Sequence, residues 1–401
     1  MNEIRGKKIL ILGFGREGQS VKRFLAAHYP NIIINTADQK DGKDYLKHLN
    51  EYDTVIRSPG IPSRLQELVD YKKNSGWITT ATNIFFSQRK GITMGVTGTK
   101  GKSTTASLTA HILKQKFSDV RLVGNIGSPM LDHLDGVTNK TIFVIELSSH
   151  QLEDIRYSPH IAILLPIVPE HLDYYASYDA YVRAKTNIIR FQTKKDVVIF
   201  HSTVKKIAET SLGKEIPIVD SKFSAPTLRG NTTNIQAAVT VAKYFDISGD
   251  TIKKSLGTFH PLPHRLEFVG EYKKIRFFND SLATIPEATI HALRALGSDV
   301  ETLIAGGFDR GLDYTILRDY LNKHPVKTLI LFPDTGEKIG RDVSIQKFFV
   351  RSMEEAVKLA YKHTPKNKIC LLSPASASFN LFKDYEDRGN QFKDWVRKLA
   401  R

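Results

Sequence analysis

Short apolar runs alternate with helical patterns along the chain and fall into three blocks. In the first block, the runs at 8–13, 31–35 and 53–56 are typical of strands, and residues 20–28 repeat apolar positions at helical spacing. Strand-like runs follow at 91–97, 141–146, 161–165 and 196–200, then at 276–279, 301–305, 328–332 and 368–372, before a helical stretch over 388–399. This alternation predicts an α/β fold in three domains, residues 1–88, 89–262 and 263–401, with Rossmann-like domains on either side of a larger central parallel sheet.

The composition fits a folded protein without membrane spans. Hydrophobic residues make up 41% and charged residues 25% of the 401 residues, as in ordinary globular domains. The apolar run at 161–168 is much shorter than the roughly 20 residues of a membrane-spanning helix, and the N-terminus reads as a first strand, not as a secretion signal. Cys370 is the only cysteine, so no intrachain disulfide can form, and we expect a cytoplasmic protein.

The formal net charge of +16 raises the question of a polyanionic partner. Lys and Arg are scattered in short pieces among acidic residues, without a long basic run or an aromatic RNA-binding signature. We therefore expect no nucleic-acid partner. Small polyanionic substrates, or simply a basic soluble surface, explain the same excess of positive charge.

A first glycine-rich motif, Gly13-Phe-Gly15-Arg-Glu-Gly18, follows the first predicted strand and opens a helix. Asp38 lies about twenty residues further on, so context and spacing match the dinucleotide-binding fingerprint. Physically, such a motif presents backbone amides to an anionic phosphate at a helix N-terminus. From this motif alone, NAD, another nucleotide diphosphate and a purely structural turn all stay open.

The sharpest motif is Gly95-Val-Thr-Gly98-Thr-Lys-Gly101-Lys102-Ser103-Thr104, between a predicted strand and a helix over 105–114. In such a loop the backbone amides contact phosphate oxygens, Lys102 would reach the β- and γ-phosphates, and the Ser103 hydroxyl would ligate Mg²⁺. The strict template has glycine where Val96 stands, and Gly95 and Gly98 shift the pattern. The agreement of strand, loop, Lys-Ser pair and helix still favours an ATP-binding loop.

Three further residues are candidates for the same sheet edge. Glu146 ends a strand-like run, where a parallel sheet places ligand-binding groups, and it could share Mg²⁺ with Ser103. His171 follows another apolar run, although a lone histidine is more often structural. Lys185 lies in a helical pattern, and by itself it would be assigned to the solvated surface.

Taken together, these segments resemble the Mur ligase family of ATP-dependent amide-bond-forming enzymes over nearly the whole chain. The resemblance is carried by residues 98–104, 124–127, 146–153, 169–173 with Lys185, 231–234, 263–267, 279–281, 306–311, 372–378 and 384–389. The stretches Ser-Ser-x-Gln-Leu-Glu at 148–153 and Ser-Pro-Ala-x-Ala-Ser at 373–378 favour the family member that adds D-glutamate.

The resemblance implies an activity and a set of cofactors. D-glutamate would be joined to UDP-N-acetylmuramoyl-L-alanine through an acyl phosphate, with ATP, two Mg²⁺ ions and a CO₂-derived carbamate on Lys185. The first domain would bind the UDP substrate, the central domain would bind ATP, and the last domain would close over the site. The two small-molecule substrates are the expected partners of a monomeric protein.

The resemblance also implies the residues that make up the site. Lys102, His171 and Lys185 would be catalytic, and Ser103, Glu146, His171 and Lys185 would hold the metal ions. Nucleotide contacts would come from Gly98, Thr99, Lys100, Gly101, Lys102, Ser103, Thr104, Asn231, Asn234, Arg265 and Asp280. The UDP substrate would contact Gly15, Arg16, Glu17, Asp38, Gln39, Ser58 and Asn125, and the incoming amino acid Thr284, Arg310, Ser378, Phe379 and Tyr385.

Two departures from the family pattern bear on function. Lys100 replaces the asparagine of the family's Thr-Asn-Gly-Lys loop and adds a cation near the phosphates. Leu282 replaces a lysine close to both substrates, so a Mur-type ligase with a different acceptor is the alternative. A dehydrogenase would use only the first glycine motif, and a folate-polyglutamating enzyme would not usually carry the N-terminal nucleotide unit. A binding protein or an inactive relative also fits the sequence.

Overall fold

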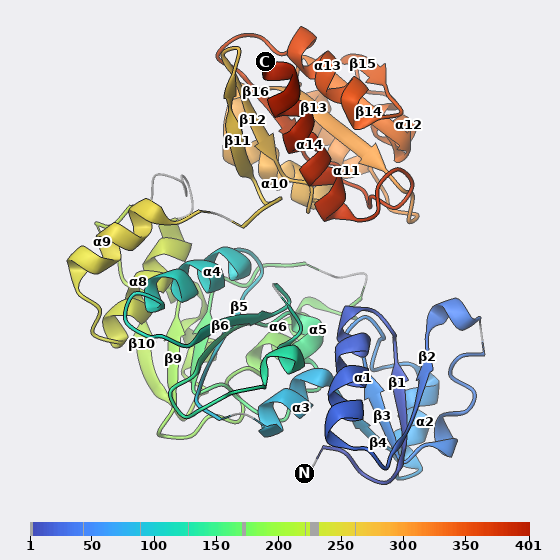
Figure 1. Cartoon of the computed structure of the whole chain (residues 1–401), viewed down its shortest axis with the longest axis vertical. Helices are drawn as coiled ribbons and strands as arrows, with labels where there is room; N and C mark the ends of the chain where they lie inside the picture. Colours follow the sequence, from blue (N-terminus) through green and yellow to red (C-terminus); the bar gives the residue numbers. More distant parts are fainter. Residues whose placement is uncertain are drawn as a thin grey trace. The chain divides into compact units, whose positions relative to one another are not determined.

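The computed structural model describes residues 3–42, 44–88, 90–126, 128–170, 174–220, 222–224, 232–260 and 262–401. Within these ranges the strands form three sheets of four, six and six strands (Figure 1). The chain divides into two compact units, Met1–His260, which contains the first two sheets, and Pro261–Arg401, which contains the third. The boundary at 88/89, inside the first unit, stays a prediction.

The first sheet is parallel, with strand order β2-β1-β3-β4. Its strands are β1 (Lys8–Leu12), β2 (Ile33–Ala37), β3 (Thr54–Arg57) and β4 (Trp77–Thr79), and its helices are α1 (Arg16–His28), α2 (Gln66–Lys73) and α3 (Ala81–Gln88). The two inner strands are almost wholly buried, whereas β2 lies at an edge and exposes most of its residues.

The central sheet is also parallel, in the order β10-β9-β8-β5-β7-β6. Its strands are β5 (Ile92–Thr97), β6 (Val120–Gly124), β7 (Ile142–Glu146), β8 (Ile161–Leu164), β9 (Val197–Phe200) and β10 (Lys214–Pro217). Its helices are α4 (Lys102–Leu113), α5 (Ser149–Leu152), α6 (Tyr178–Thr186), α7 (Lys205–Ala208), α8 (Thr232–Tyr244) and α9 (Gly249–Thr258). The chain leaves β5 on one side and later returns to its other side, so β5 ends where an open α/β sheet usually binds ligands.

The third sheet has the order β11-β12-β16-β13-β14-β15. Its strands are β11 (Glu267–Tyr272), β12 (Ile275–Asn279), β13 (Val300–Gly307), β14 (Thr328–Asp334), β15 (Gln346–Phe349) and β16 (Ile369–Leu372). Its helices are α10 (Pro286–Leu296), α11 (Thr315–Lys323), α12 (Thr335–Gly340), α13 (Met353–His363) and α14 (Tyr385–Ala400). Successive residues such as Leu303 and Ile304 enter different core clusters, so apolar side chains are buried on both faces of this sheet.

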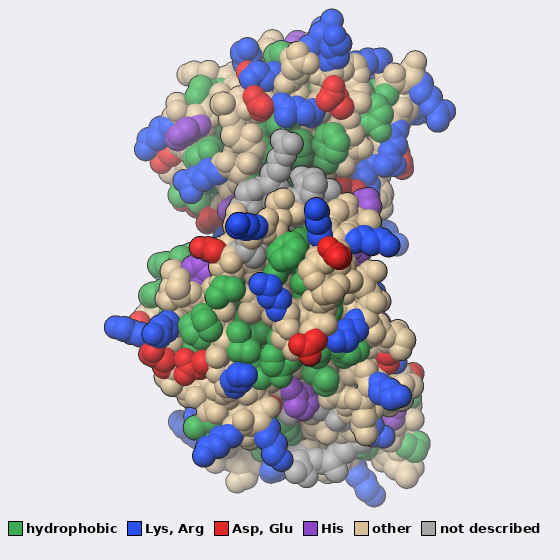
Figure 2. Space-filling model, turned by 90° about the vertical axis from the view of Figure 1, so that its left-hand side faces the viewer, with side chains coloured by type: hydrophobic (Ala, Val, Ile, Leu, Met, Phe, Trp, Pro, Cys, Tyr) green, Lys and Arg blue, Asp and Glu red, His purple; other side chains and the backbone are tan. Residues whose placement is uncertain are grey.

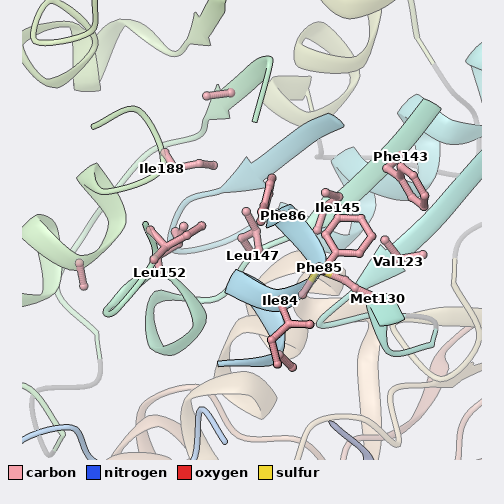
Figure 3. Packing of buried hydrophobic residues seen from close by; sticks show 14 of the residues in the cluster. Ile84, Phe85, Phe86, Val123, Met130, Phe143, Ile145, Leu147, Leu152 and Ile188 are labelled. Carbon is pink, nitrogen blue, oxygen red and sulfur yellow. The ribbon is translucent and has the colours of Figure 1, made fainter. Parts of the chain in front are cut away.

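One hydrophobic cluster joins the first two sheets within the first unit. It contains Ile9 and Phe24 from the first sheet and its helix α1, together with Phe85 and Phe143. Phe85 comes from α3, and its ring meets that of Phe143 edge to face at a centroid distance of 5.0 Å (Figure 3). Because this core is continuous, α3 attaches the first sheet to the central one.

Most strands predicted from the sequence are confirmed, and the differences have a common cause. The strands absent from the prediction are β4, β6, β10, β11 and β15, each of which lies at the edge of its sheet. An edge strand buries fewer residues, so its apolar pattern is weak; β10 and β15 expose most of their residues. β11 is antiparallel to β12, which adds a hairpin to an otherwise parallel sheet. Helix α1 begins at Arg16, earlier than the expected residue 20.

No helix in the described ranges combines the length and apolar character needed to cross a bilayer. On the face drawn in Figure 2, Lys and Arg side chains are interspersed with acidic, apolar and other residues. This surface matches their scattered positions in the sequence. The absence of a nucleic-acid partner stays a prediction.

Candidate active site

The phosphate loop predicted from the sequence connects β5 to α4, and two of its glycines are required by the backbone. Gly98 has φ +151°, and a Cβ built there would lie 2.6 Å from the side chain of Leu165. Gly101 has φ +84° and caps α4, and its Cβ would lie 2.1 Å from Asn234 Oδ1. A residue with a side chain therefore could not replace either glycine without a change in the backbone of the loop. It ends at a helix N-terminus, where backbone N–H groups can bind an anion.

Three lysines surround this loop. Lys102 Nζ donates to Gly98 O at 3.1 Å and to Thr99 O at 2.8 Å. Lys185 Nζ, from α6, donates to the same Gly98 O at 2.8 Å. Lys100 forms an ion pair with Glu170, which follows β8. Lys100 and Lys102 thus supply positive charge where the sequence predicts ATP phosphates.

Lys185 is not a surface lysine. Its side chain is buried, and burial, assisted by the charge of Lys102, lowers its pKa from 10.5 to about 6 although Glu170 and Glu146 act in the opposite direction. At neutral pH the amine is therefore largely uncharged. An uncharged amine is the form that reacts with CO₂, so the environment of Lys185 fits a carbamate.

Two oxygen donors near the loop fit a hard cation. Glu146 ends β7, and its Oε1 accepts a hydrogen bond from Asn125 Nδ2 at 3.0 Å. Its Oε2 is buried and has no hydrogen-bond partner among the residues that the structure describes. The Ser103 side chain, in the first turn of α4, is fully buried. Mg²⁺ prefers such oxygen ligands, and a bound cation would satisfy the unpaired Glu146 oxygen.

A complete metal-binding cluster is not visible in the part of the chain that the structure describes, which holds no group of three or more His, Cys, Asp or Glu side chains arranged for a metal. His171, the predicted ligand of a second Mg²⁺, lies outside the described residues, as does Asn231. Asn234 lies in α8 and accepts a hydrogen bond from Thr105 at 3.3 Å. Its contact with Gly101 brings it close to the phosphate loop.

Apart from Asn125, which follows β6, the residues predicted to hold the UDP substrate gather at the carboxyl ends of β1, β2 and β3. Asp38 accepts hydrogen bonds from the backbone N–H groups of Phe14 at 2.7 Å and Lys40 at 3.2 Å, and these bonds lower its pKa. Ser58 Oγ donates to Gly13 O at 2.7 Å. Asp38 and Ser58 therefore fix the glycine loop from two sides. Gly15, Arg16 and Gln39 lie at the surface beside them.

Polar contacts connect this first loop to the central sheet. Glu17 Oε1 accepts a hydrogen bond from Gln151 Nε2 at 2.6 Å, while its Oε2 is buried and meets no hydrogen-bond partner in the described part of the chain. Burial raises the pKa of Glu17. Arg57, next to Ser58, is buried and contacts Asp154 Oδ2 at 2.9 Å. Helix α5 and the residues after it are thus bound to the glycine loop.

In the third sheet, the residues predicted to hold the amino acid follow β12, β13 and β16. Arg310 Nη2 donates to Thr284 O at 3.2 Å. Ser378 is buried, whereas Phe379 is exposed and packs edge to face on Phe308. Tyr385 opens α14, and its carbonyl accepts from Ser281 Oγ at 2.8 Å. The prediction that these residues hold a substrate stays open.

The predicted nucleotide residues of the third sheet also lie together. Asp280 Oδ1 accepts from Leu266 N at 3.1 Å and its Oδ2 from Ser373 Oγ at 2.9 Å. Burial raises the pKa of Asp280 to about 7, although the charge of Arg265 acts in the opposite direction. Arg265 and Asp280 therefore interact at the end of β12.

Sequence reasoning missed Arg388, which connects the loops of the third sheet. It is fully buried, and it donates to Ser281 Oγ and O at 3.0 and 2.9 Å, to Ser376 O at 3.0 Å and to Ala377 O at 3.1 Å. A Cβ on Gly307 would lie 3.2 Å from Arg388 Nη1, so the third loop also contacts it. The sequence signal that could have identified Arg388 is its position in the Asp-Tyr-Glu-Asp-Arg-Gly stretch at 384–389, which carries part of the resemblance. Gln151, in the stretch 146–153, was missed in the same way, whereas Arg57 lies outside every stretch that carries the resemblance.

The parallel central sheet and its loop define the class of P-loop nucleotide-binding α/β proteins. Residues 96–259 match the family model described as the Mur ligase middle domain. The chain is 33% identical to the UDP-N-acetylmuramoylalanine–D-glutamate ligase of Caldicellulosiruptor bescii, covering 99% of both chains. It is 32% identical to the Acetivibrio thermocellus protein of the same name, covering 99% of this chain and 97% of that protein. The chain belongs to the Mur ligase family.

Solved structures support the same fold. The MurF ligase of Thermotoga maritima in complex with ADP superposes with a TM-score of 0.60 at 15% identity, covering 99% of this chain and 96% of that one. The UDP-N-acetylmuramate-alanine ligase MurC of the same organism gives 0.59 at 16% identity, with coverage of 98% and 100%. At these identities the likeness extends to the fold alone.

Proposed function

We propose that this chain is a ligase that adds D-glutamate to UDP-N-acetylmuramoyl-L-alanine with hydrolysis of ATP to ADP and phosphate, in the synthesis of peptidoglycan precursors. The name shared by its full-length relatives supports this proposal. The observation that carries it is the phosphate loop, where Lys102 and Lys185 contact Gly98 O and Lys100 pairs with Glu170, together with Glu146, whose buried Oε2 has no hydrogen-bond partner among the described residues.

In the first step, the terminal carboxylate of the UDP substrate attacks the γ-phosphorus of ATP. A bond forms between the carboxylate oxygen and phosphorus, the bond to the bridging oxygen breaks, and ADP leaves with the electron pair. Lys102 and the N–H groups at the start of α4 stabilise the charge on the transferring phosphoryl oxygens. The product is an acyl phosphate.

Ser103 and Glu146, with His171 and a carbamate on Lys185, would hold two Mg²⁺ ions. When bound, Mg²⁺ supplies positive charge to the phosphate oxygens. Carbamate formation joins the uncharged Lys185 nitrogen to the carbon of CO₂ and releases one proton, which converts a neutral amine into an anion. A lysine buried among phosphate-binding groups is then compatible with a neighbouring metal, since an ammonium would be repelled.

In the second step, the amine of D-glutamate attacks the acyl carbon. The new carbon–nitrogen bond replaces the bond to the phosphate oxygen, inorganic phosphate leaves, and the nitrogen loses a proton. Arg310 can meet a carboxylate of the amino acid with two parallel hydrogen bonds. Thr284, Ser378, Phe379 and Tyr385 complete the proposed pocket, and Arg265 and Asp280 act on the nucleotide.

The alternative is a Mur-type ligase with another acceptor. Leu282 follows Asn279, Asp280 and Ser281 at the end of β12, and its side chain supplies no charge to an acceptor. D-glutamate stays the preferred acceptor in our proposal, because Arg310 supplies a cation. A dehydrogenase would leave the phosphate loop and the buried Lys185 unexplained.

The decisive experiment measures phosphate release from ATP, with UDP-N-acetylmuramoyl-L-alanine and D-glutamate each omitted in turn. We expect release only when both are present. A screen of amino acids at saturating UDP substrate then tests the acceptor. If D-glutamate is inactive while L-lysine or meso-diaminopimelate drives release, the acceptor assignment is wrong and the ATP assignment survives. A monomeric state and a cytoplasmic location remain predictions of this proposal.

A further inference from the structure

The ion pair between Lys100 and Glu170 connects the phosphate loop to the segment that follows β8. We propose that Lys100 is a second phosphate-binding cation of the loop, and that Glu170 holds it until a nucleotide phosphate replaces the carboxylate. This inference rests on the proposed function, because it takes ATP as the ligand. It assigns Lys100 a role that an uncharged residue at this position could not have.

The position of Lys100 in the loop places its side chain beside the predicted phosphate site. It lies between Gly98 and Gly101, whose backbone angles only glycine adopts easily, and two residues before Lys102 at the N-terminus of α4. Its side chain therefore starts from the backbone that would surround the phosphates. The side chain is 48% exposed, whereas that of Glu170 is 18% exposed. The lysine is thus the accessible member of the pair.

The backbone on both sides of the ion pair is fixed without it. Thr99 N donates to Pro166 O at 2.9 Å, Thr99 Oγ1 donates to Val168 O at 3.0 Å, and Val168 N donates to Thr99 Oγ1 at 2.9 Å. These bonds fasten the residue before Lys100 to the segment that leads to Glu170. A change of partner therefore requires only a rotation of the Lys100 side chain.

The three lysines at the loop differ in the kind of acceptor they meet. Lys102 and Lys185 donate to the neutral carbonyls of Gly98 and Thr99. Lys100 instead meets a carboxylate, and a phosphate competes with a carboxylate for the same cation. A partly exposed ion pair contributes little stability, whereas a triphosphate carries several negative charges. The exchange is therefore favourable when ATP binds.

The test is a double-mutant cycle on the full-length chain, measuring the Kd of ATP in EDTA by calorimetric titration. The absence of Mg²⁺ removes any contribution of the neighbouring metal site. We expect Lys100→Asn to weaken ATP binding about tenfold, since a charge-assisted hydrogen bond is lost. Glu170→Gln should strengthen it about threefold, since the competitor is removed. In the Lys100→Asn background, Glu170→Gln should have a clearly smaller effect, because only the influence of Glu170 on Lys185 and on more distant phosphate charge remains.

Three outcomes would overturn the inference. Lys100→Asn could bind ATP normally, Glu170→Gln could weaken binding, or Glu170→Gln could have the same effect in both backgrounds.

Lys100→Met, which keeps the length of the side chain, separates loss of charge from loss of packing. The pair Lys205 and Glu209, exposed on the same unit, is a matched control whose variants should leave the Kd unchanged. If the unsubstituted chain binds ATP neither in EDTA nor in the presence of Mg²⁺, the proposed function is wrong and the inference about Lys100 is wrong with it.

Discussion

Two glycine-rich loops in the first unit have the same local architecture and opposite surroundings. Each follows the first strand of its sheet and leads into a helix, β1 into α1 and β5 into α4. Carboxylates surround the first loop, where Asp38 binds the backbone of Phe14 and Glu17 binds Gln151. Lys100, Lys102 and Lys185 surround the second.

The difference shows that a glycine motif fixes a backbone path, whereas the side chains around it select the ligand. A loop with neighbouring carboxylates repels a compact triphosphate and suits a ligand that also offers hydrogen-bond donors, such as a nucleotide sugar. A loop with Lys100 and Lys102 suits the concentrated charge of ATP, and the uncharged amine of Lys185 beside it suits a carbamate. The predictions below test this division, because each residue should affect one substrate and not the other.

The largest effect is expected at the second loop. Lys102→Ala should reduce phosphate release from ATP by roughly 100- to 1,000-fold, because it removes the cation that stabilises the transferring phosphoryl group. The fold should persist, since the Lys102 amine contacts loop carbonyls and not the core. Turnover and the thermal midpoint are measured together. Near-normal turnover would refute the phosphate-loop assignment.

Lys185→Ala should also abolish most activity, by roughly 100-fold, because the anion provided by the carbamate is lost. Added formate or acetate should restore part of it, since a small carboxylate can occupy the vacated volume. The unsubstituted enzyme should lose activity when CO₂ and bicarbonate are removed. Activity that is insensitive to CO₂, together with no rescue, would exclude the carbamate.

A smaller and more selective effect is expected at the first loop. Asp38→Ala releases the N–H of Phe14, so the KM for the UDP substrate should rise about fivefold while the KM for ATP is unchanged. Asp53→Ala is the control, because Asp53 binds the N–H groups of Lys7 and Lys8 at the opposite end of β1. An equal rise in both KM values would contradict the division between the loops.

The smallest effect concerns Glu17. Its pKa is raised in the folded state, so folding takes up a proton and stability is lost as the pH rises from the unfolded value through the folded one. Glu17→Gln has no such loss. Its thermal midpoint relative to the unsubstituted chain should therefore increase from pH 5 to pH 8, by roughly 1–3 °C. A difference that is constant with pH would show that Glu17 is charged throughout.

The sequence predicted the interior strands and both loops, because these depend on local patterns. Lys102 and Ser103 are placed by glycine spacing and by the helix that follows them. Local patterns could not identify Lys185, because a lysine in a helical pattern gives no sign of burial. Only the resemblance to the family indicated its role. The role of Arg388 was missed although its stretch carries part of the resemblance, because α14 is rich in charged residues and the contacts of Arg388 come from loops more than 100 residues away in the sequence as well as nearby.

The strand order of the central sheet has a consequence for synthesis of the chain. β5 is made first but lies in the middle, paired with β7 and β8, which begin at Ile142 and Ile161. At roughly 5–20 residues per second, an emerging β5 waits several seconds on the ribosome for its first neighbour. During that time the apolar residues Met94 and Val96, which end up fully buried, have no strand beside them. Nascent chains of this length are therefore the form of the protein most in need of protection from aggregation.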